Sequence, residues 1–249
     1  MRIHVTGATG YLGRELLSLR PDATGERVEV REPEAVTALL ERLRPDVVIH
    51  TAYRQTGEGA REIVVDGSAN VAAAAAAIGA RLIHLSTDVV FDGRLGRPYV
   101  ESDAPCPCSP YGEAKAESER VVREACPAAL IVRTSLIVGG PDREPSPHEL
   151  LARDPDATFF DDELRSPVQV GDLASALLEL AALDLGGVLH VAGADDVSRA
   201  DLAELVTGGA VRRAPAPSGR PLDCRLDSSR ARSLLGSPLR GVRGLYGRG

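Results

Sequence analysis

The sequence contains little lysine, few aromatic residues and no tryptophan. Of its 29 basic residues only Lys115 is a lysine, and aromatic residues fill 3% of the 249 positions. Arginine is a permanently charged planar fork, whereas lysine is a compact ammonium whose pKa shifts readily on burial. Lys115 is therefore the one basic position at which the chain carries a tunable charge.

Other scarcities disfavour several classes of function. No run of residues approaches the roughly 20 apolar positions that a membrane-spanning helix needs. The net charge of −7 argues against nucleic acid or an anionic membrane as the main partner. Cys106 and Cys108 are the only close cysteine pair, so we expect neither a disulfide framework nor a metal site. The first residues enter a strand without a signal peptide, which predicts a cytoplasmic protein.

The chain alternates between short apolar strands and amphipathic helices. Near-continuous apolar strands separated by helices are typical of a parallel sheet that is covered on both faces. The expected strands are 2–6, 46–50, 81–85, 129–133 and 187–191, and the expected helices are 14–19, 34–43, 68–78, 110–124, 172–182, 199–206 and 228–235. This order predicts an α/β fold, a Rossmann-like doubly wound parallel sheet with right-handed connections.

The second half of the chain is more fragmented than the first. Residues 141–155 are rich in proline and charge and predict a loop with at most a short helix. We expect residues 140–170 and 192–249 to form a small C-terminal substrate lobe on the same sheet, so that 1–249 is one Rossmann-type domain. Six consecutive alanines from Ala72 to Ala77 predict a closely packed helix, against the sheet or a partner subunit.

Three motifs carry chemistry. Thr6-Gly7-Ala8-Thr9-Gly10-Tyr11-Leu12-Gly13 places glycines between a strand and a helix, a pattern that favours pyrophosphate binding at the helix N-terminus. Ser86-Thr87-Asp88 follows the strand 81–85, where hydroxyl groups can bond to a substrate carbonyl. Tyr111 and Lys115 stand four residues apart, so they share a helix face. A cation beside a phenol lowers the pKa of the phenol, which suits a general acid or base.

Together these motifs resemble the extended branch of the short-chain dehydrogenase/reductase superfamily. The matching segments are TGATGYLG, RPDVVIHTAY, IHLSTDVVFDG, SPYGEAK, LIVRTS and RPLDCRLDSS. The STDVVFDG and SPYGEAK segments are most similar to the dTDP-4-dehydrorhamnose reductase family, whose members reduce the C4 ketone of a nucleotide-linked deoxysugar.

The resemblance implies roles for matching residues. Thr87 would polarise the ketone with support from Ser86 and Asp88, Tyr111 would donate the proton, and Lys115 would hold the nicotinamide ribose and tune Tyr111. NADPH or NADH would supply the hydride. The remaining cofactor contacts would come from Gly7, Thr9, Gly10, Tyr11, Leu12, Gly13, Thr51, Ala52 and Tyr53. Arg165 would bind the diphosphate of a nucleotide-sugar substrate, because arginine forks suit that geometry.

The sequence departs from the family pattern at three places. Residues 20–31 leave room for one strand, about 27–30, where relatives have two, so the preference between NADP and NAD stays open, with Arg27 or Arg31 as candidates for a 2′-phosphate. Val64 stands where relatives carry asparagine, and the segment between Gly140 and Phe159 is short. Two alternatives therefore remain: the same chemistry on a non-sugar ketone or aldehyde, or a non-catalytic regulatory subunit.

Further polar residues are expected to be structural. His4, His50, His84 and His190 lie on apolar strands and predict packed histidines, and His148 lies in a loop with no visible partner. Relatives of the extended branch often form two-fold helical interfaces through the helices that correspond to 68–78 and 110–124. The resemblance therefore implies a homodimer.

Overall fold

A five-stranded sheet forms the centre of the computed structural model, which describes residues 1–247. Its strands follow the order β1 (Ile3–Thr6), β2 (Val47–His50), β3 (Arg81–Thr87), β4 (Leu130–Thr134) and β9 (Gly187–His190). β2 pairs in parallel with both β1 and β3. The predicted Rossmann-like α/β fold is thereby confirmed.

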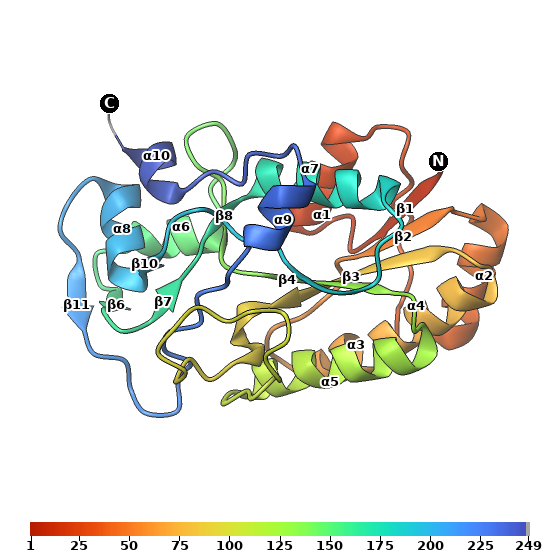
Figure 1. The fold of residues 1–249 in the computed structure, drawn as a ribbon, viewed down its shortest axis with the longest axis horizontal. Coiled ribbons are helices and arrows are strands. Elements are labelled where there is room, and N and C mark those ends of the chain that lie inside the picture. The colour runs from red at the N-terminus through yellow and green to blue at the C-terminus, as the bar shows by residue number, and fades with distance from the viewer. Residues whose placement is uncertain (248–249) are drawn as a thin grey trace. The chain divides into compact units, whose positions relative to one another are not determined.

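Helices cover both faces of this sheet (Figure 1). One face carries α2 (Pro33–Leu43), α3 (Ala60–Val64), α4 (Asp66–Ala77) and α5 (Pro110–Ala125), and the other carries α1 (Tyr11–Leu19) and α7 (Val170–Ala182). Strands β1, β2 and β4 are buried along their whole length, as expected for near-continuous apolar strands in a sheet covered on both faces.

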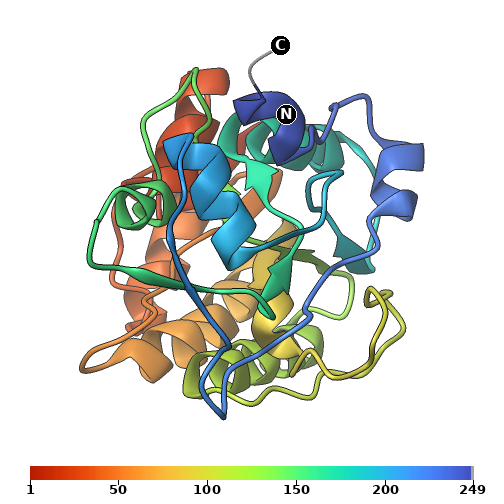
Figure 2. The ribbon, with the colours of Figure 1, turned by 90° about the vertical axis from the view of Figure 1, so that its left-hand side faces the viewer.

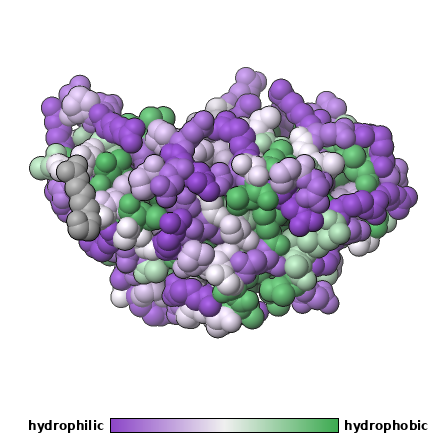
Figure 3. Space-filling model, turned by 90° about the horizontal axis from the view of Figure 1, so that it is seen from above, coloured by the Kyte–Doolittle hydropathy of each residue, from purple (hydrophilic) through white to green (hydrophobic). Residues whose placement is uncertain are grey.

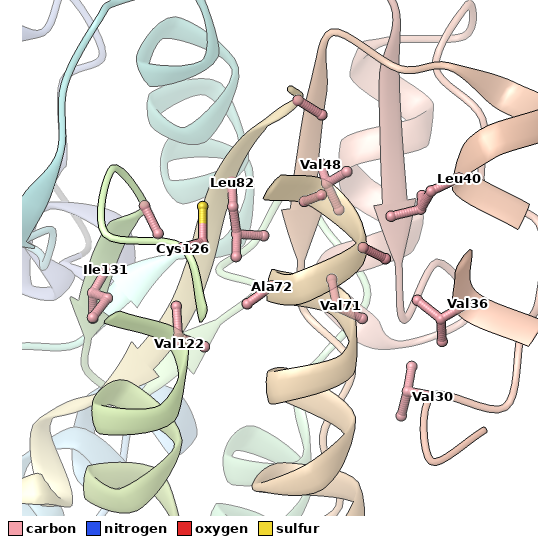
Figure 4. Packing of buried hydrophobic residues seen from close by; sticks show 14 residues of the cluster. Val30, Val36, Leu40, Val48, Val71, Ala72, Leu82, Val122, Cys126 and Ile131 are labelled. Carbon is pink, nitrogen blue, oxygen red and sulfur yellow. The ribbon is translucent and has the colours of Figure 1, made fainter. Parts of the chain in front are cut away.

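The alanine-rich helix α4 packs inside its own chain. Val71, Ala72, Ala74 and Ala75 are buried in one cluster with residues of α2, α5 and strands β2 to β4. Figure 4 shows Val71 and Ala72 in this cluster between Val48 and Leu82 of the sheet and Val122 of α5. Small side chains let helices approach closely, so packing within the chain explains the buried alanines, whereas Ala73, Ala76 and Ala77 are exposed.

The chain divides into two compact units. The first comprises residues 1–86, 110–132 and 177–189, and the second comprises residues 87–109, 133–176 and 190–249. The predicted substrate-lobe segments 140–170 and 192–249 both fall in the second unit. The assignment of 1–249 to a single domain stays a prediction.

The second unit is built from short elements (Figure 2). Its helical segments include η1 (Asp88–Val90), α6 (Pro147–Ala152), α8 (Arg199–Thr207), α9 (Ser229–Leu234) and α10 (Val242–Tyr246). Three two-stranded sheets pair β10 (Val197–Ser198) with β7 (Leu164–Arg165), β11 (Arg212–Ala214) with β6 (Thr158–Phe160), and β5 (Ile137–Val138) with β8 (Val168–Gln169). A cluster of Ala152, Phe159, Ala200 and Ala203 packs α6 and β6 against α8.

The expected strand at 27–30 is wrong. Thr24 instead forms a single bridge to His4 at the edge of β1, exchanging backbone hydrogen bonds with Ile3 and Val5. Val30 packs into the hydrophobic cluster, and its carbonyl accepts a hydrogen bond from the Asn70 side chain (3.0 Å). A side-chain donor thus replaces the strand ladder. The first helix also begins earlier than expected, at Tyr11.

The surface is mainly polar where it can be seen. Hydrophilic residues cover most of the face drawn in Figure 3, with smaller hydrophobic patches between them. Within residues 1–247, no helix combines the length and the apolar character needed to cross a membrane.

Candidate active site

The glycine-rich turn between β1 and α1 is shaped for a close ligand. Gly7 has φ +75°, and a side chain there would place Cβ 2.6 Å from the backbone nitrogen of Ala52. A Cβ on Gly13 would lie 2.3 Å from the Gly7 carbonyl oxygen. Both positions therefore require glycine. Gly10 is different, because it is exposed and a Cβ there would meet only the Gly7 carbonyl, at 3.1 Å.

This turn fits the pyrophosphate of a dinucleotide. Gly10 is the N-cap of α1, and the first turn of α1 carries no acidic residue that would repel an anion. Thr9 is exposed beside Gly10, and Tyr11 is half-buried. The side chain of Leu12 is buried in the core, so only its backbone can face a ligand.

The residues after β2 line the same turn. Thr51 is buried and donates its hydroxyl to the carbonyl of Thr6 (2.8 Å), which ties the end of β2 to the end of β1. The backbone of Ala52 packs against Gly7. Tyr53 is 57% exposed, and its ring centroid lies 6.1 Å from that of Tyr111. The turn and the phenol of Tyr111 are therefore neighbours within the first unit.

Lys115 is buried under the helix that carries Tyr111. α5 begins at Pro110, so Tyr111 stands in its first turn and Lys115 one turn later. Lys115 is 4% exposed, and its Nζ donates to the carbonyl of Leu85 on β3 (2.6 Å). Burial lowers the pKa of Lys115 from 10.5 to about 8, an effect that the charge of Glu119 partly offsets. The ammonium thus titrates close to physiological pH.

Two stacked histidines lie beneath the ammonium. His84 Nε2 is 3.4 Å from Lys115 Nζ and 3.1 Å from Ser118 Oγ, and its ring stacks on His50 with centroids 5.4 Å apart. Burial, and then the charge of Lys115, hold the pKa of His84 well below 6.5, and the same causes lower that of His50 to about 3. Both imidazoles are therefore neutral. The packed role expected for them agrees with these contacts, and His84 additionally touches the lysine.

Ser86 bonds to a buried carboxylate. Its hydroxyl donates to Glu119 Oε1 (2.7 Å), and the other oxygen of Glu119 pairs with Arg123 (2.8 Å). Glu119 is fully buried and stands one turn after Lys115 on α5. The hydroxyl proton of Ser86 is thus used in a hydrogen bond to α5, so Ser86 stabilises the position of this helix.

Thr87 and Asp88 follow Ser86 in the chain and belong to the second unit. Thr87 is half-buried at the end of β3, and its hydroxyl donates to Asp88 Oδ1 (3.1 Å). Asp88 is buried and accepts a further hydrogen bond from Ser135 (2.6 Å). Burial raises the pKa of Asp88, against the opposing charge of Arg165. Of the two hydroxyl residues, Thr87 is the one with access to solvent.

Arg165 lies beside Asp88 within the second unit. Its Nε is 3.6 Å from Asp88 Oδ2, and its terminal nitrogens donate to the carbonyls of Leu164, Pro221 and Leu222. The residue is 3% exposed. These partners occupy most of the guanidinium, so Arg165 braces Asp88 and the 221–222 backbone.

Comparisons with known proteins assign this fold and these motifs to a family. Residues 1–243 match the model of the RmlD substrate binding domain. A dTDP-4-dehydrorhamnose reductase from Mycobacterium tuberculosis is 35% identical over 79% of this chain and 67% of its own length. The chain belongs to the RmlD substrate binding domain family. The resemblance to extended short-chain dehydrogenases/reductases is thereby confirmed.

Other relatives of this RmlD-family chain show how far the likeness extends. The crystal structure of dTDP-4-dehydrorhamnose reductase from Bacillus anthracis in complex with NADP has a TM-score of 0.84 and 25% identity, covering 98% of each chain. Methionine adenosyltransferase 2 subunit beta from Rattus norvegicus is 31% identical over 81% of this chain and 70% of its own length. The relatives of this chain therefore include a protein named as a subunit of another enzyme.

The family departures can now be located in the structure. Val64 is 2% exposed and packs with Val65 and Ala114, so an apolar contact stands where relatives carry asparagine. Arg31 pairs with Glu29 through two hydrogen bonds (2.8 and 2.9 Å) and lies against Gly59. Arg31 is therefore neutralised by its own neighbour, and the preference between NADP and NAD stays open.

Two residues that contact the site of this RmlD-family chain were not identified from the sequence. Glu119 follows Lys115 by four residues, a spacing that places both on one helix face, yet burial of the carboxylate was not foreseeable from charge pattern alone. His84 was expected only to pack, although it contacts the catalytic lysine candidate.

Proposed function

We propose that this protein is an NAD(P)H-dependent ketoreductase that reduces the C4 ketone of a dTDP-4-dehydro-6-deoxy sugar. The observation that carries the proposal is the only lysine of the chain, buried one turn after Tyr111 and hydrogen-bonded to Leu85 next to Ser86 and Thr87. A buried ammonium costs stability, and its retention beside a phenol suits acid–base chemistry. The Mycobacterium tuberculosis relative, named a dTDP-4-dehydrorhamnose reductase, supports the substrate class.

The dinucleotide would be held by the glycine-rich turn. The backbone N–H groups of Thr9, Tyr11 and Leu12 face the pyrophosphate. The Gly10 N–H closes the turn by donating to the Gly7 carbonyl (2.9 Å), and the lack of a side chain at Gly10 leaves room for the phosphate. Thr51, Ala52 and Tyr53 line the turn from the end of β2. NADPH or NADH supplies the hydride when bound. The relative from Bacillus anthracis, solved in complex with NADP, supports a nicotinamide cofactor.

The chain's own residues handle the proton and the developing charge. Tyr111 donates its phenol proton to the alkoxide oxygen, and Lys115 supplies a positive charge that stabilises the resulting phenolate. To donate a hydrogen bond to the ketone oxygen, the Thr87 hydroxyl turns its single proton away from Asp88 Oδ1, which accepts it in this structure. Ser86 and Glu119 act through α5, because their hydrogen bond fixes the helix against β3.

Substitution of Tyr111 by phenylalanine tests this function. The variant keeps the ring but lacks the acidic proton, so turnover of a dTDP-4-dehydro-6-deoxy sugar with NADPH falls by about a hundredfold to ten-thousandfold. Binding of NADPH, followed by fluorescence, stays unchanged. Tyr246→Phe is the matched control, because it removes a phenol hydroxyl that bonds to Glu149 on α6. Unchanged turnover in Tyr111→Phe contradicts the proposal.

The same assay separates the alternatives. Turnover of a non-sugar ketone with no response to dTDP sugars would favour a reductase of other metabolism. No oxidation of NADPH on any ketone, together with co-purification of an unrelated chain, would favour a regulatory subunit. The retained Tyr111 and Lys115 pair argues against that role, because a regulatory subunit gains nothing from a buried titratable lysine.

The homodimer stays a prediction. The outward face of α5 carries Arg120, which pairs with Glu117 (2.6 Å) and Glu124 (2.5 Å) along the same helix. Size-exclusion chromatography with light scattering measures the oligomeric state directly.

A further inference from the structure

Three arginines gather in the second unit around the β7–β10 ladder. Val197 pairs with Arg165 and Ser198 with Leu164, and the amide of Arg199 donates to the carbonyl of Glu163 (3.0 Å), which continues the ladder by one residue. Residues two apart in a strand share a face, as do residues directly opposite. Glu163 and Arg165 therefore project from one face of the ladder, and Arg199, at the start of α8, stands opposite Glu163.

The two carboxylates near Arg199 already have arginine partners. Asp88 is occupied by Arg165 and Ser135. Glu163 is 2% exposed and forms an ion pair with Arg220, whose guanidinium also lies 4.9 Å above the ring of Phe160. Neither carboxylate forms an ion pair with Arg199.

Arg199 is a half-buried cation without an anionic partner. Its Nη1 contacts His148 Nδ1 (3.2 Å), and within residues 1–247 it has no carboxylate at ion-pair distance. Burial, and then the charge of Arg199, lower the pKa of His148 to about 4, so the imidazole is neutral and accepts a hydrogen bond from the guanidinium. Burial and the charge of Arg165 also lower the pKa of Arg199, and the charges of Glu163 and Asp88 offset only part of this effect. An unneutralised guanidinium in this position is costly unless an anion joins it.

Packing holds this pair in place. His148 lies in α6 and Arg199 begins α8, and the two helices are fixed by the cluster of Ala152, Phe159, Ala200 and Ala203. Capping boxes at Ser146 and Ser198 fix the first turns from which both side chains project. Figure 1 shows α6, α8, β7 and β10 side by side. The pair is thus preorganised, which reduces the entropy lost on binding.

We propose that Arg199, oriented by His148, forms an anion subsite that binds phosphate oxygens of the nucleotide diphosphate in the substrate. The inference rests on the proposed function for the identity of the nucleotide. It replaces the expectation that Arg165 performs this role, because the guanidinium of Arg165 is already bonded to Asp88 and three backbone carbonyls. Both guanidinium and imidazole are half-buried, so solvent and a ligand reach them.

Calorimetric titration with dTDP and with thymidine tests the subsite without requiring turnover. Arg199→Gln should weaken dTDP binding about tenfold to a hundredfold, the effect of one lost charge-assisted hydrogen bond, and should leave thymidine and NADPH binding unchanged. Arg199→Lys keeps the charge and loses the fork, so its affinity for dTDP should be intermediate. Arg212→Gln is the matched control, because Arg212 is an exposed arginine that pairs with Asp156 (3.3 Å).

A second measurement distinguishes ligand binding from structural support. Without ligand, Arg199→Gln should melt no lower than the wild type, because it removes an unneutralised buried charge. A lower melting temperature, or an equal loss of thymidine and dTDP affinity, overturns the subsite. Loss of NADPH affinity instead would assign Arg199 to the cofactor phosphate and also overturn it.

The outcome for the subsite is separable from that for the proposed function. Turnover of a dTDP-4-dehydro sugar with the same KM in Arg199→Gln and wild type overturns the subsite and leaves the function standing. Wild-type protein that reduces a non-sugar ketone and does not bind dTDP overturns both.

Discussion

Replacement of Lys115 by methionine measures what the buried ammonium costs the fold. Burial lowers the pKa of Lys115 from 10.5 to about 8, and that difference corresponds to about 3 kcal/mol at neutral pH. Methionine has similar length and carries no charge. After allowance for the lost hydrogen bond to Leu85, we expect Lys115→Met to raise the free energy of unfolding by about 2 kcal/mol at pH 7. The melting temperature should rise by about 4 to 8 °C, while turnover is lost.

The pH dependence has a defined sign. Between pH 8 and 10.5 the unfolded chain still binds a proton at Lys115 that the folded protein has released. The free energy of unfolding of the wild type therefore rises through this window, and the penalty is fully present below pH 8. The advantage of Lys115→Met should shrink toward zero by about pH 10.5. Because Lys115 is the only lysine, the difference between the two proteins isolates its titration.

Nuclear magnetic resonance measures the pKa of Lys115 directly. Protein grown with lysine labelled at Cε gives one side-chain resonance, whose midpoint should lie near 8. Glu119→Gln removes the negative charge that favours the ammonium, so the midpoint should fall below that of the wild type. Glu124→Gln is the matched control, because Glu124 is a 62% exposed acid on the same helix.

The burial argument has a clear point of failure. A midpoint near 10.5, or a Lys115→Met variant that is no more stable than the wild type at pH 7, would show that the ammonium is solvated. Arg94→Met, which removes a 66% exposed cation, should change stability by less than about 0.5 kcal/mol at every pH.

Two further pairs of substitutions separate structural from chemical roles. Ser86→Ala leaves buried Glu119 short of a donor and should lower the free energy of unfolding, measured in urea, by about 1 to 3 kcal/mol. Thr87→Ala should lower kcat about a hundredfold and leave the stability unchanged. The reverse pattern would exchange the roles of the two residues. Gly13→Ala should destabilise the fold, because its Cβ would meet Gly7 and Ala8 backbone within 2.7 Å, whereas Gly10→Ala should fold normally and bind NADPH more weakly. Equal NADPH affinity in Gly10→Ala would refute the proposed cradle.

Regular elements of this chain were predictable because their periodicity is local. The helices corresponding to α2, α4, α5, α7 and α8 begin and end within a few residues of the expected bounds. The strand expected at 27–30 was wrong because strand formation needs a partner, and Asn70 supplies the bond to Val30 instead. The two- and three-residue strands of the second unit carry no periodic signal, so only tertiary contacts create them.

Within the candidate site, residue identity was foreseeable but partners were not. Tyr111 and Lys115 stand at a helical spacing that the sequence displays. The bond from Ser86 to Glu119 joins residues 33 positions apart, and the contact from Arg199 to His148 joins residues 51 positions apart. No local pattern encodes such pairs. They explain why we assign Ser86 to the support of α5 and why we propose Arg199 for the anion subsite, whereas a substrate contact of Arg165 stays a prediction.

The sequence by itself determined the five strands of the central sheet, the longer helices, the glycine turn and the shared face of Tyr111 and Lys115, because each depends on residues a few positions apart. Only the tertiary structure decided which charges are neutralised. It buried Lys115 against Leu85 and His84 and bound Arg165 to Asp88 and backbone carbonyls. Within residues 1–247, it left Arg199 with no carboxylate at ion-pair distance. Burial and ion pairing set the free energy of a charge, and both depend on segments distant in sequence.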